Sequence, residues 1–157
     1  MYIYNKKILK KSVLWILDRV VIASALGAVF IRVGNFFNSE MIGKPSEEGF
    51  PLAVIFRQLD SIPRHPGQLY EAFGYVFVFL ILFFLYWKTK KSMQTGFLFG
   101  LFLVLLMSVR VIVEQFKIAQ IDSREDWILG LNTGQVLSIP FVLCGLYFMF
   151  LYKPKTN

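Results

Sequence analysis

The sequence predicts an all-α membrane protein, a bundle of four transmembrane helices over residues 13–38, 70–87, 97–116 and 134–152. Two properties predict this class. Of the 157 residues, 56% are hydrophobic and only 17% are charged, with 17 phenylalanines, which is unlike the composition of a soluble domain. The hydrophobic residues also form blocks of about 17–25 residues, a length that crosses a bilayer as a helix. We expect a single membrane domain over residues 1–157.

The first predicted helix, residues 13–38, would measure about 39 Å at roughly 1.5 Å per residue, so it must tilt or extend beyond the bilayer. Glycine and proline then break the chain at Gly43-Lys44-Pro45 and at Gly49-Phe50-Pro51. Pro63 and Pro66 precede the second helix. These residues predict a long irregular connection between the first two spans.

The fourth predicted helix contains Pro140, which removes a backbone donor and should kink the helix. The single cysteine, Cys144, lies in the same apolar segment, so an intrachain disulfide is excluded. We expect Cys144 to be a small buried hydrophobic residue. Two pairs of small residues four positions apart are expected to serve helix packing rather than chemistry, namely Ala23 with Gly27 and Gly96 with Gly100.

The distribution of lysine predicts the orientation in the membrane. With four spans, both termini lie on the same side. The segments on that side are rich in lysine and lack acidic residues, whereas the loops 39–69 and 117–133 hold most of the acids. The positive-inside rule therefore places both termini in the cytoplasm. The lysines concerned are Lys6, Lys7, Lys10, Lys11, Lys88, Lys90, Lys91, Lys153 and Lys155.

The net charge of +7 does not indicate nucleic-acid binding. The lysines flank apolar segments, and they do not form a solvated face interleaved with aromatic residues on which bases could stack. Membrane topology accounts for the charge, so we expect no nucleic-acid partner.

Ionisable side chains from four stretches of sequence fall at the same depth of the predicted bundle. Arg32 lies in the last third of the first helix, and Glu71 in the first turn of the second. Arg110 and Glu114 lie in the last third of the third helix, and His65 precedes the second. In the predicted orientation all five lie near the external face. Charges inside a bilayer are costly and commonly functional, so we expect these side chains to line one cavity.

Helical spacing places several of these residues on shared faces. Arg32, Asn35 and Ser39 occupy positions i, i+3 and i+7 of one face, with Glu40 close to it. The alignment predicts that the polar residues at the end of the first helix act together.

Two charged pairs have structural explanations of their own. Arg110 and Glu114, at i and i+4 of the third helix, are equally well explained as an ion pair that locks two helices. Asp18 and Arg19 lie near the opposite end of the first helix, where snorkelling or a local ion pair explains them. Only Arg110 and Glu114 are retained as site candidates.

His65 is the only histidine of the chain, and Pro66 biases its backbone towards extended geometry. A lone loop histidine is often without a catalytic role, and that alternative stays open. Its position between Arg64 and Tyr70, at the mouth of the polar cluster, equally favours a role in moving a proton near neutral pH.

Two arginines near the outer leaflet suit the phosphate of a lipid headgroup, because a guanidinium binds phosphate bidentately. The residues therefore predict a phospholipid site at the outer leaflet with a proton-transfer group beside it. They do not predict which reaction takes place there.

Three segments hold most of these polar residues: IRVGNFFNSE (31–40) with GKP (43–45), RHPGQLYEA (64–72), and RVIVE (110–114) with GQVLS (134–138). They resemble the hallmark motifs of the prolipoprotein diacylglyceryl transferase family. They occur in the family's order, within the expected spans, and the resemblance covers the chain from about Leu17 to its end.

The resemblance implies transfer of an sn-1,2-diacylglyceryl group from phosphatidylglycerol to the lipobox cysteine of a preprolipoprotein, with release of glycerol 1-phosphate. This is the first step of bacterial lipoprotein maturation, and it implies a protein of the plasma (inner) membrane. No metal or organic cofactor is implied, and no residues have metal-ligand spacing. Arg32 and Arg110 would hold the lipid phosphate and stabilise the departing glycerol phosphate.

The resemblance also implies roles for the other polar residues. Asn35, Glu40, Gly43 and Glu114 would shape and brace the site. His65 or Tyr70 would assist in activating the acceptor thiol, since the thiolate is the nucleophile. The expected catalytic residues are Arg32, His65, Arg110 and Glu114, and the expected substrate-binding residues are Asn35, Glu40, Gly43, Tyr70 and Glu71.

Two features depart from the family's pattern. Family members are longer, with upstream spans that carry a His-Gly-Gly motif, and Lys117 stands where the family usually has arginine. The sequence leaves open whether the chain is the transferase or a remnant that needs a partner chain carrying the missing spans. A transporter or channel is a third interpretation. It is disfavoured because the main polar cluster is confined to one leaflet.

Overall fold

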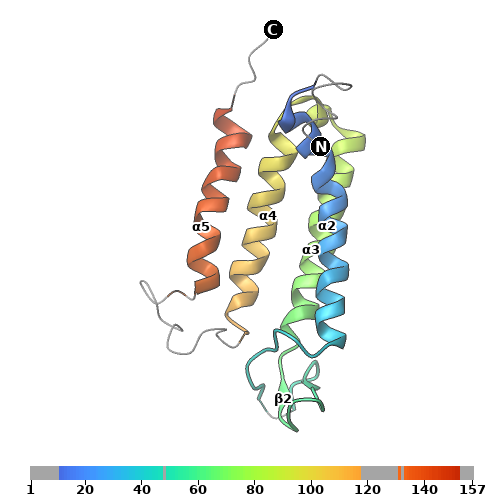
Figure 1. Cartoon of the computed structure of the whole chain (residues 1–157), viewed down its shortest axis with the longest axis vertical. Coiled ribbons are helices and arrows are strands. Elements are labelled where there is room, and N and C mark those ends of the chain that lie inside the picture. Colours follow the sequence, from blue (N-terminus) through green and yellow to red (C-terminus); the bar gives the residue numbers. More distant parts are fainter. Residues whose placement is uncertain (1–10, 48, 118–130, 132, 153–157) are drawn as a thin grey trace.

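The chain folds into a bundle of four long helices with an irregular loop region at one end (Figure 1). The computed structural model describes residues 11–47, 49–117, 131 and 133–152. In Figure 1, α5 lies at one edge next to α4, and α2 and α3 lie side by side at the other. The helices are α2 (Val13–Phe37), α3 (Gly67–Lys88), the 3-10 turn η2 (Lys90–Met93), α4 (Phe97–Glu114), α5 (Thr133–Leu146) and its π-helical continuation η3 (Tyr147–Leu151).

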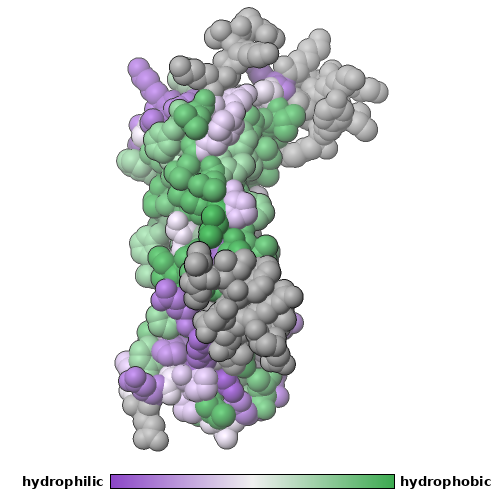
Figure 2. Space-filling model, turned by 90° about the vertical axis from the view of Figure 1, so that its left-hand side faces the viewer, coloured by the Kyte–Doolittle hydropathy of each residue, from purple (hydrophilic) through white to green (hydrophobic). Residues whose placement is uncertain are grey.

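Four helices, with η3 counted as part of α5, are long and apolar enough to cross a membrane. Figure 2 shows the corresponding surface, a broad hydrophobic belt between two ends at which hydrophilic residues gather. The predicted all-α fold with four transmembrane helices is therefore confirmed, and the chain is a multi-pass membrane protein. We call the end that carries residues 38–66 and 115–117 the loop end, and the end that carries η2, η3 and the start of α2 the terminal end.

The ends of α2 have local causes. Ser12 caps its start, because the side-chain oxygen accepts a hydrogen bond from the N–H of Trp15 at 3.2 Å. The helix ends at Phe37, and Ser39 and Met41 both adopt a left-handed backbone with a φ of 55°. Ser39 therefore lies outside the helix, and its predicted helical alignment with Arg32 is wrong.

Backbone pairing ties the loop end together. Strand β1 (Val54–Ile55) pairs antiparallel with β2 (Pro63–Arg64). The N–H of Lys44 donates to the carbonyl of Phe116 at 2.8 Å, and the N–H of His65 donates to the carbonyl of Lys44 at 3.0 Å. The loop after α2 thus holds together the segment before α3 and the segment after α4.

Apolar side chains of α2, α3 and α4 form the core of the bundle. Helices α4 and α5 meet through small residues, as predicted for Gly100: a Cβ atom there would lie 2.5 Å from the carbonyl oxygen of Gly145. A Cβ at Gly27 would meet nothing within 4 Å among the described residues, so the predicted packing role of Gly27 is wrong. The buried core residues are Val21, Ala25, Val78, Leu82, Phe97 and Leu98.

Helix α5 continues through Pro140. Two positions before it, the hydroxyl of Ser138 donates to the carbonyl of Gly134 at 2.7 Å. Cys144 is exposed on the outer face of α5, so its predicted burial is wrong. An apolar neighbourhood in the sequence did not imply a buried residue, because the outside of a membrane helix is also apolar.

Asp18, near the start of α2, is buried with 1% of its surface exposed. Its carboxylate accepts hydrogen bonds from the backbone N–H groups of Gly96 (2.6 Å) and Phe99 (2.9 Å) at the start of α4. The expectation that Asp18 snorkels or pairs locally is therefore wrong, because the free N–H groups of α4 hold its carboxylate inside the bundle. Arg19 instead donates to the carbonyl of Trp15 at 2.7 Å and lies over that ring, 3.4 Å from its centroid.

Candidate active site at the loop end

Glu71, in the first turns of α3, is fully buried, and each of its oxygens is paired with a different cation. The Arg32 Nε lies 2.8 Å from Oε2, and the Lys117 Nζ lies 2.8 Å from Oε1. The two cations come from α2 and from the segment after α4, so one carboxylate joins three parts of the chain. Two positive charges on one carboxylate leave the group Arg32–Glu71–Lys117 with one net positive charge.

Asn35 fixes the Arg32 side chain from a second direction. With its amide turned to suit its neighbours, Asn35 accepts a hydrogen bond from Arg32 Nη1 at 3.2 Å and donates to the carbonyl of Ile31 at 3.2 Å. The predicted grouping of Arg32 with Asn35 on one helical face is confirmed. The guanidinium is oriented by both Glu71 and Asn35.

Gln68, one turn before Glu71, connects α3 to the loop after α2. Its side chain is fully buried, and its Nε2 donates to the backbone carbonyl of Glu40 at 2.5 Å. The left-handed residues Ser39 and Met41 turn the chain so that this carbonyl faces α3. Glu40 thus contacts α3 through its backbone.

Gly43 lies where two chain segments cross. A Cβ atom there would overlap the backbone carbonyl of His65 and would lie 2.9 Å from the carbonyl oxygen of Phe116. Only glycine permits this approach. Gly43 therefore positions the segments that carry His65 and Lys117.

His65 and Tyr70 form a pair beside the charged group. The His65 Nδ1 lies 3.2 Å from the Tyr70 hydroxyl, and the imidazole packs against Phe50 and Phe116 with centroid distances of 4.7 Å and 5.5 Å. The pair lies at the wall of an almost entirely apolar cavity of about 450 Å³. The residues lining this cavity are Phe50, Leu52, His65, Tyr70, Ile112, Val113 and Phe116.

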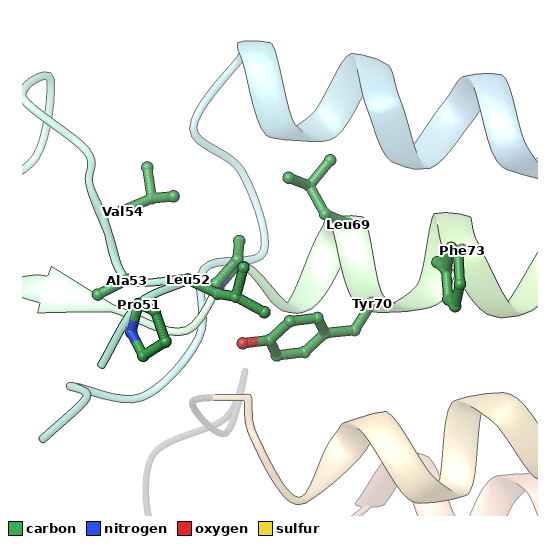
Figure 3. A pocket seen from close by; sticks show the side chains of 8 residues that line it. Pro51, Leu52, Ala53, Val54, Leu69, Tyr70 and Phe73 are labelled. Carbon is green, nitrogen blue, oxygen red and sulfur yellow. The ribbon is translucent and has the colours of Figure 1, made fainter. Parts of the chain in front are cut away.

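A second cavity, of about 680 Å³, lies on another side of the Tyr70 ring. Figure 3 shows this ring extending from α3 towards Leu52 and Pro51 of the loop. Neither Arg32 nor Arg110 lines either of these two cavities. The polar residues are therefore divided between a charged group and a neighbouring apolar cavity.

The two parts of the site are adjacent in the chain. Tyr70 and Phe116 line the smaller cavity, and the residues that follow them, Glu71 and Lys117, pair with each other. Successive side chains of a helix point about 100° apart, which explains the different surroundings of Tyr70 and Glu71 in α3. Lys117 follows the end of α4, and its backbone pairing with Gly43 directs it to Glu71.

Arg110 approaches the charged group from α4. Its Nε is buried and has no hydrogen-bond partner within the described part of the chain. The buried Tyr75, one turn after Glu71, interacts electrostatically with Glu71, Arg32 and Arg110. Both arginines thus act on the same region between the helices.

Glu114 packs against the start of α5. A Cβ atom at Gly134 would lie 2.5 Å from the Glu114 Oε1, so a larger residue at position 134 would displace the carboxylate. The predicted motifs RVIVE and GQVLS therefore meet in space.

Arg64 braces the surrounding loop through Asp60. Its Nη2 donates to the Asp60 Oδ2 at 2.5 Å, and its Nη1 donates to the carbonyl of Gly43 at 3.5 Å. The hydrogen bond from Arg64, with a smaller contribution from the N–H of Ile62, holds the pKa of Asp60 below its usual 3.8. Among the described residues, no group of three or more His, Cys, Asp or Glu side chains could hold a metal ion.

Sequence reasoning missed three residues of this site. The sequence marks Lys117 only as a departure from the family's pattern and Gln68 only as part of the motif RHPGQLYEA, and it does not single out Tyr75. Helical spacing carried a signal for two of them, since Gln68 and Tyr75 lie three before and four after Glu71. Lys117 lies beyond the end of α4, so helical spacing carried no signal for it.

Comparison with known proteins agrees with the family resemblance of the three sequence motifs. A family model described as prolipoprotein diacylglyceryl transferase matches residues 1–151. A phosphatidylglycerol–prolipoprotein diacylglyceryl transferase of Tolumonas auensis is 47% identical over 138 residues, which cover 88% of this chain and 52% of the relative. Proteins of the same name from Bacteroides fragilis and Chloroherpeton thalassium are 41% and 42% identical, over 100% and 95% of this chain and 55% and 54% of the relatives. The chain thus spans about half the length of these relatives.

Proposed function

The chain belongs to the prolipoprotein diacylglyceryl transferase family, and we propose that it transfers the diacylglyceryl group of phosphatidylglycerol to the cysteine thiol of a prolipoprotein. The names of its relatives supply the two substrates. The loop end supplies residues suited to each of them.

The net positive charge of the largely buried group Arg32–Glu71–Lys117 is the observation that carries this proposal. An unbalanced charge away from water is unfavourable unless a ligand of opposite charge binds beside it. The Arg110 Nε, which has no hydrogen-bond partner among the described residues, offers a further donor to such an anion. The phosphodiester of phosphatidylglycerol supplies the missing negative charge, and Arg32 and Arg110 bind it.

The acceptor thiol reacts on the side of His65 and Tyr70. His65 removes the thiol proton, and the Tyr70 hydroxyl at 3.2 Å orients the imidazole. The thiolate sulfur bonds to the glyceryl carbon that carries the phosphate ester, and the carbon–oxygen bond to phosphate breaks. Glycerol phosphate departs with the electron pair, and the proton passes from His65 to the departing phosphate or to water. Arg32 and Arg110 stabilise the charge that develops on the leaving group.

The remaining candidates position these groups. Asn35 orients Arg32, and Glu71 holds Arg32 at the depth of the phosphate. Glu40 and Gly43 fix the loop that carries His65. Glu114, one of the expected catalytic residues, fixes the end of α4 against the start of α5.

The proposed orientation places both termini in the cytoplasm and the loop end at the external face of a bacterial inner membrane. Cysteines introduced at Ser46 and Arg57, in a Cys144→Ser background, should react in intact cells with a thiol reagent that cannot cross membranes. A cysteine at Lys91, on η2, should not react. Labelling of the Lys91→Cys variant alone would show that the orientation is the opposite of the proposed one.

A direct transfer assay tests the function. Membranes that lack their own transferase receive this chain, either alone or together with the part of the Tolumonas auensis relative outside the matched region. Labelled lipid should pass from phosphatidylglycerol to the cysteine of a prolipoprotein peptide in at least one arm. Transfer only with the added part would support the interpretation that a partner chain is needed, and transfer in neither arm would contradict the function.

A further inference from the structure

Helix α4 is capped by a residue of another helix. Its N-cap residue, Gly96, makes no side-chain cap, and the cap is supplied by Asp18 of α2, which lies 78 positions earlier in the chain. A serine or threonine N-cap would bond only to an N–H group within its own helix, whereas Asp18 ties the start of α4 to α2. The buried carboxylate therefore does more than cap.

Gly96 is suited to this contact. Its φ of 90° lies in the left-handed region, which other residues rarely adopt, and it turns the chain so that its own N–H faces Asp18. The N–H of Phe99, in the first turn of α4, completes the pair at 2.9 Å. The positive end of the α4 dipole further favours the carboxylate.

The contact lies at matching positions of two parallel helices. Both α2 and α4 run from the terminal end to the loop end (Figure 1). Arg32 follows Asp18 by 14 positions, and Arg110 follows Gly96 by 14 positions. Fourteen residues make almost four turns and about 21 Å. Arg32 therefore lies on nearly the same face of α2 as Asp18, and Arg110 on nearly the same face of α4 as Gly96. A contact at one end thus sets the relative depth of the two arginines at the other.

We propose that Asp18 is a positioning residue that fixes the axial register of α4 against α2, so that Arg32 and Arg110 reach one phosphate. The phosphate in this statement rests on the proposed function, whereas the register rests on the capping contact alone. Apolar surfaces in lipid do not specify register strongly, because lipid tails are as apolar as leucine. A single buried polar contact can specify the register of two helices, as a buried polar residue does in a coiled coil.

The distance between spin labels at Asn38 and Gln115, at the loop ends of α2 and α4, measures the register directly. The full chain is labelled in lipid nanodiscs, in a Cys144→Ser background. Asp18→Ala removes both acceptors, whereas Asp18→Asn keeps one oxygen and loses the charge. Thr89→Ala is the matched control at the same end, since among the described residues the hydroxyl of Thr89 bonds only to the nearby backbone groups of Leu85 and Lys91.

Asp18→Ala should shift or broaden the label distance by up to one turn, about 5.4 Å, and Asp18→Asn and Thr89→Ala should keep the native distance. In the transfer assay, Asp18→Ala should raise the KM for phosphatidylglycerol and lower kcat/KM on the order of 100-fold. Asp18→Asn should restore most of both. A loss confined to kcat, with the native label distance, would indicate only a smaller folded fraction and would contradict the proposal.

Gly96→Val tests the same contact from the α4 side if Asp18→Ala fails to insert. A β-branched residue is strained at this φ, so the distance should change in the same way. Either variant, inserted with native distance and native KM, overturns the register role. If the wild-type chain transfers no lipid while the label distance responds to Asp18→Ala, the register role stands and the proposed function falls.

Discussion

Asp18 and Glu71 are both buried carboxylates within membrane-spanning helices, and they are satisfied in opposite ways. Asp18, at the terminal end, accepts hydrogen bonds from two backbone N–H groups of α4. Glu71, at the loop end, pairs with the side chains of Arg32 and Lys117. One carboxylate is held by the backbone of a neighbouring helix, and the other by two long side chains.

The difference separates a structural contact from a binding site. Backbone donors at a helix start are fixed in place and have no further capacity once they are capped. A guanidinium has five N–H donors, so Arg32 keeps donors for a ligand after pairing with Glu71. Burial of Asp18 therefore uses all the donors that it contacts, whereas burial of Glu71 leaves donors of Arg32 that can bind an anion.

Removing each carboxylate in turn should give the largest contrast. Glu71→Leu leaves the buried Lys117 and the partly buried Arg32 without a counter-ion and should lower the free energy of unfolding by about 3–5 kcal/mol. Asp18→Leu leaves neutral N–H groups at a helix start and should cost about 1–3 kcal/mol. Thermal unfolding in nanodiscs, followed by tryptophan fluorescence, measures both. Equal losses would mean that the two ends are built alike.

Arg110→Lys should reduce kcat/KM for transfer on the order of 100-fold while the protein stays folded. Lysine keeps the charge but cannot reproduce the bidentate fork of a guanidinium. The assay is the transfer of labelled lipid to the prolipoprotein peptide. Arg57→Lys, at an exposed loop arginine, is the matched control and should have no effect. Full activity in Arg110→Lys would assign Arg110 to packing.

The smallest effect is expected at Asp60, whose carboxylate pairs with Arg64 in contact with water. Its pKa in the folded protein is lowered below 3.8, so the contribution of this pair to stability is present above pH 3.8 and is lost as the pH falls through the folded pKa. Hydrogen exchange of residues 54–64 should be independent of the pair's ionisation between about pH 5 and 8 and should rise only in acid. Asp60→Asn should raise the exchange rate slightly between about pH 5 and 8 and should match the wild type in acid, where the pair is already lost. An increase in exchange that is already complete at about pH 6 would show that the Asp60–Arg64 pair does not control it.

The four helices could be predicted from the sequence because hydropathy and charge determine them directly. Glycine and proline located the long loop, although α3 begins at Gly67, three residues before the predicted start. The spacing of Arg32 and Asn35 correctly placed them together. These features depend on residues close in sequence.

The failures concern contacts between distant segments. Asp18 caps a helix that begins 78 positions later in the chain, and no residue near Asp18 in the sequence indicates this contact. The sequence therefore predicted a snorkelling charge or a local ion pair at this position. Lys117 lies beyond the end of α4, where helical spacing no longer had to apply, and only the backbone pairing with the loop at Gly43 brings it to Glu71. One cavity lined by all the polar residues was expected, but the structure has a charged group and an apolar cavity beside it. The two are separate because Tyr70 and Glu71 point in different directions from α3.

The central claim is that the surplus positive charge of the group Arg32–Glu71–Lys117 binds the lipid phosphate. Equilibrium binding of short-chain dihexanoyl phosphatidylglycerol to the full chain in detergent tests it most directly. Lys117→Met removes the surplus and should weaken binding on the order of tenfold, equivalent to about 1.4 kcal/mol. Lys117→Met with Glu71→Gln leaves Arg32 unpaired, restores the surplus and should recover most of the affinity. Uncharged dihexanoylglycerol should bind all three proteins alike, and a double variant that binds the phospholipid no better than Lys117→Met would contradict the account.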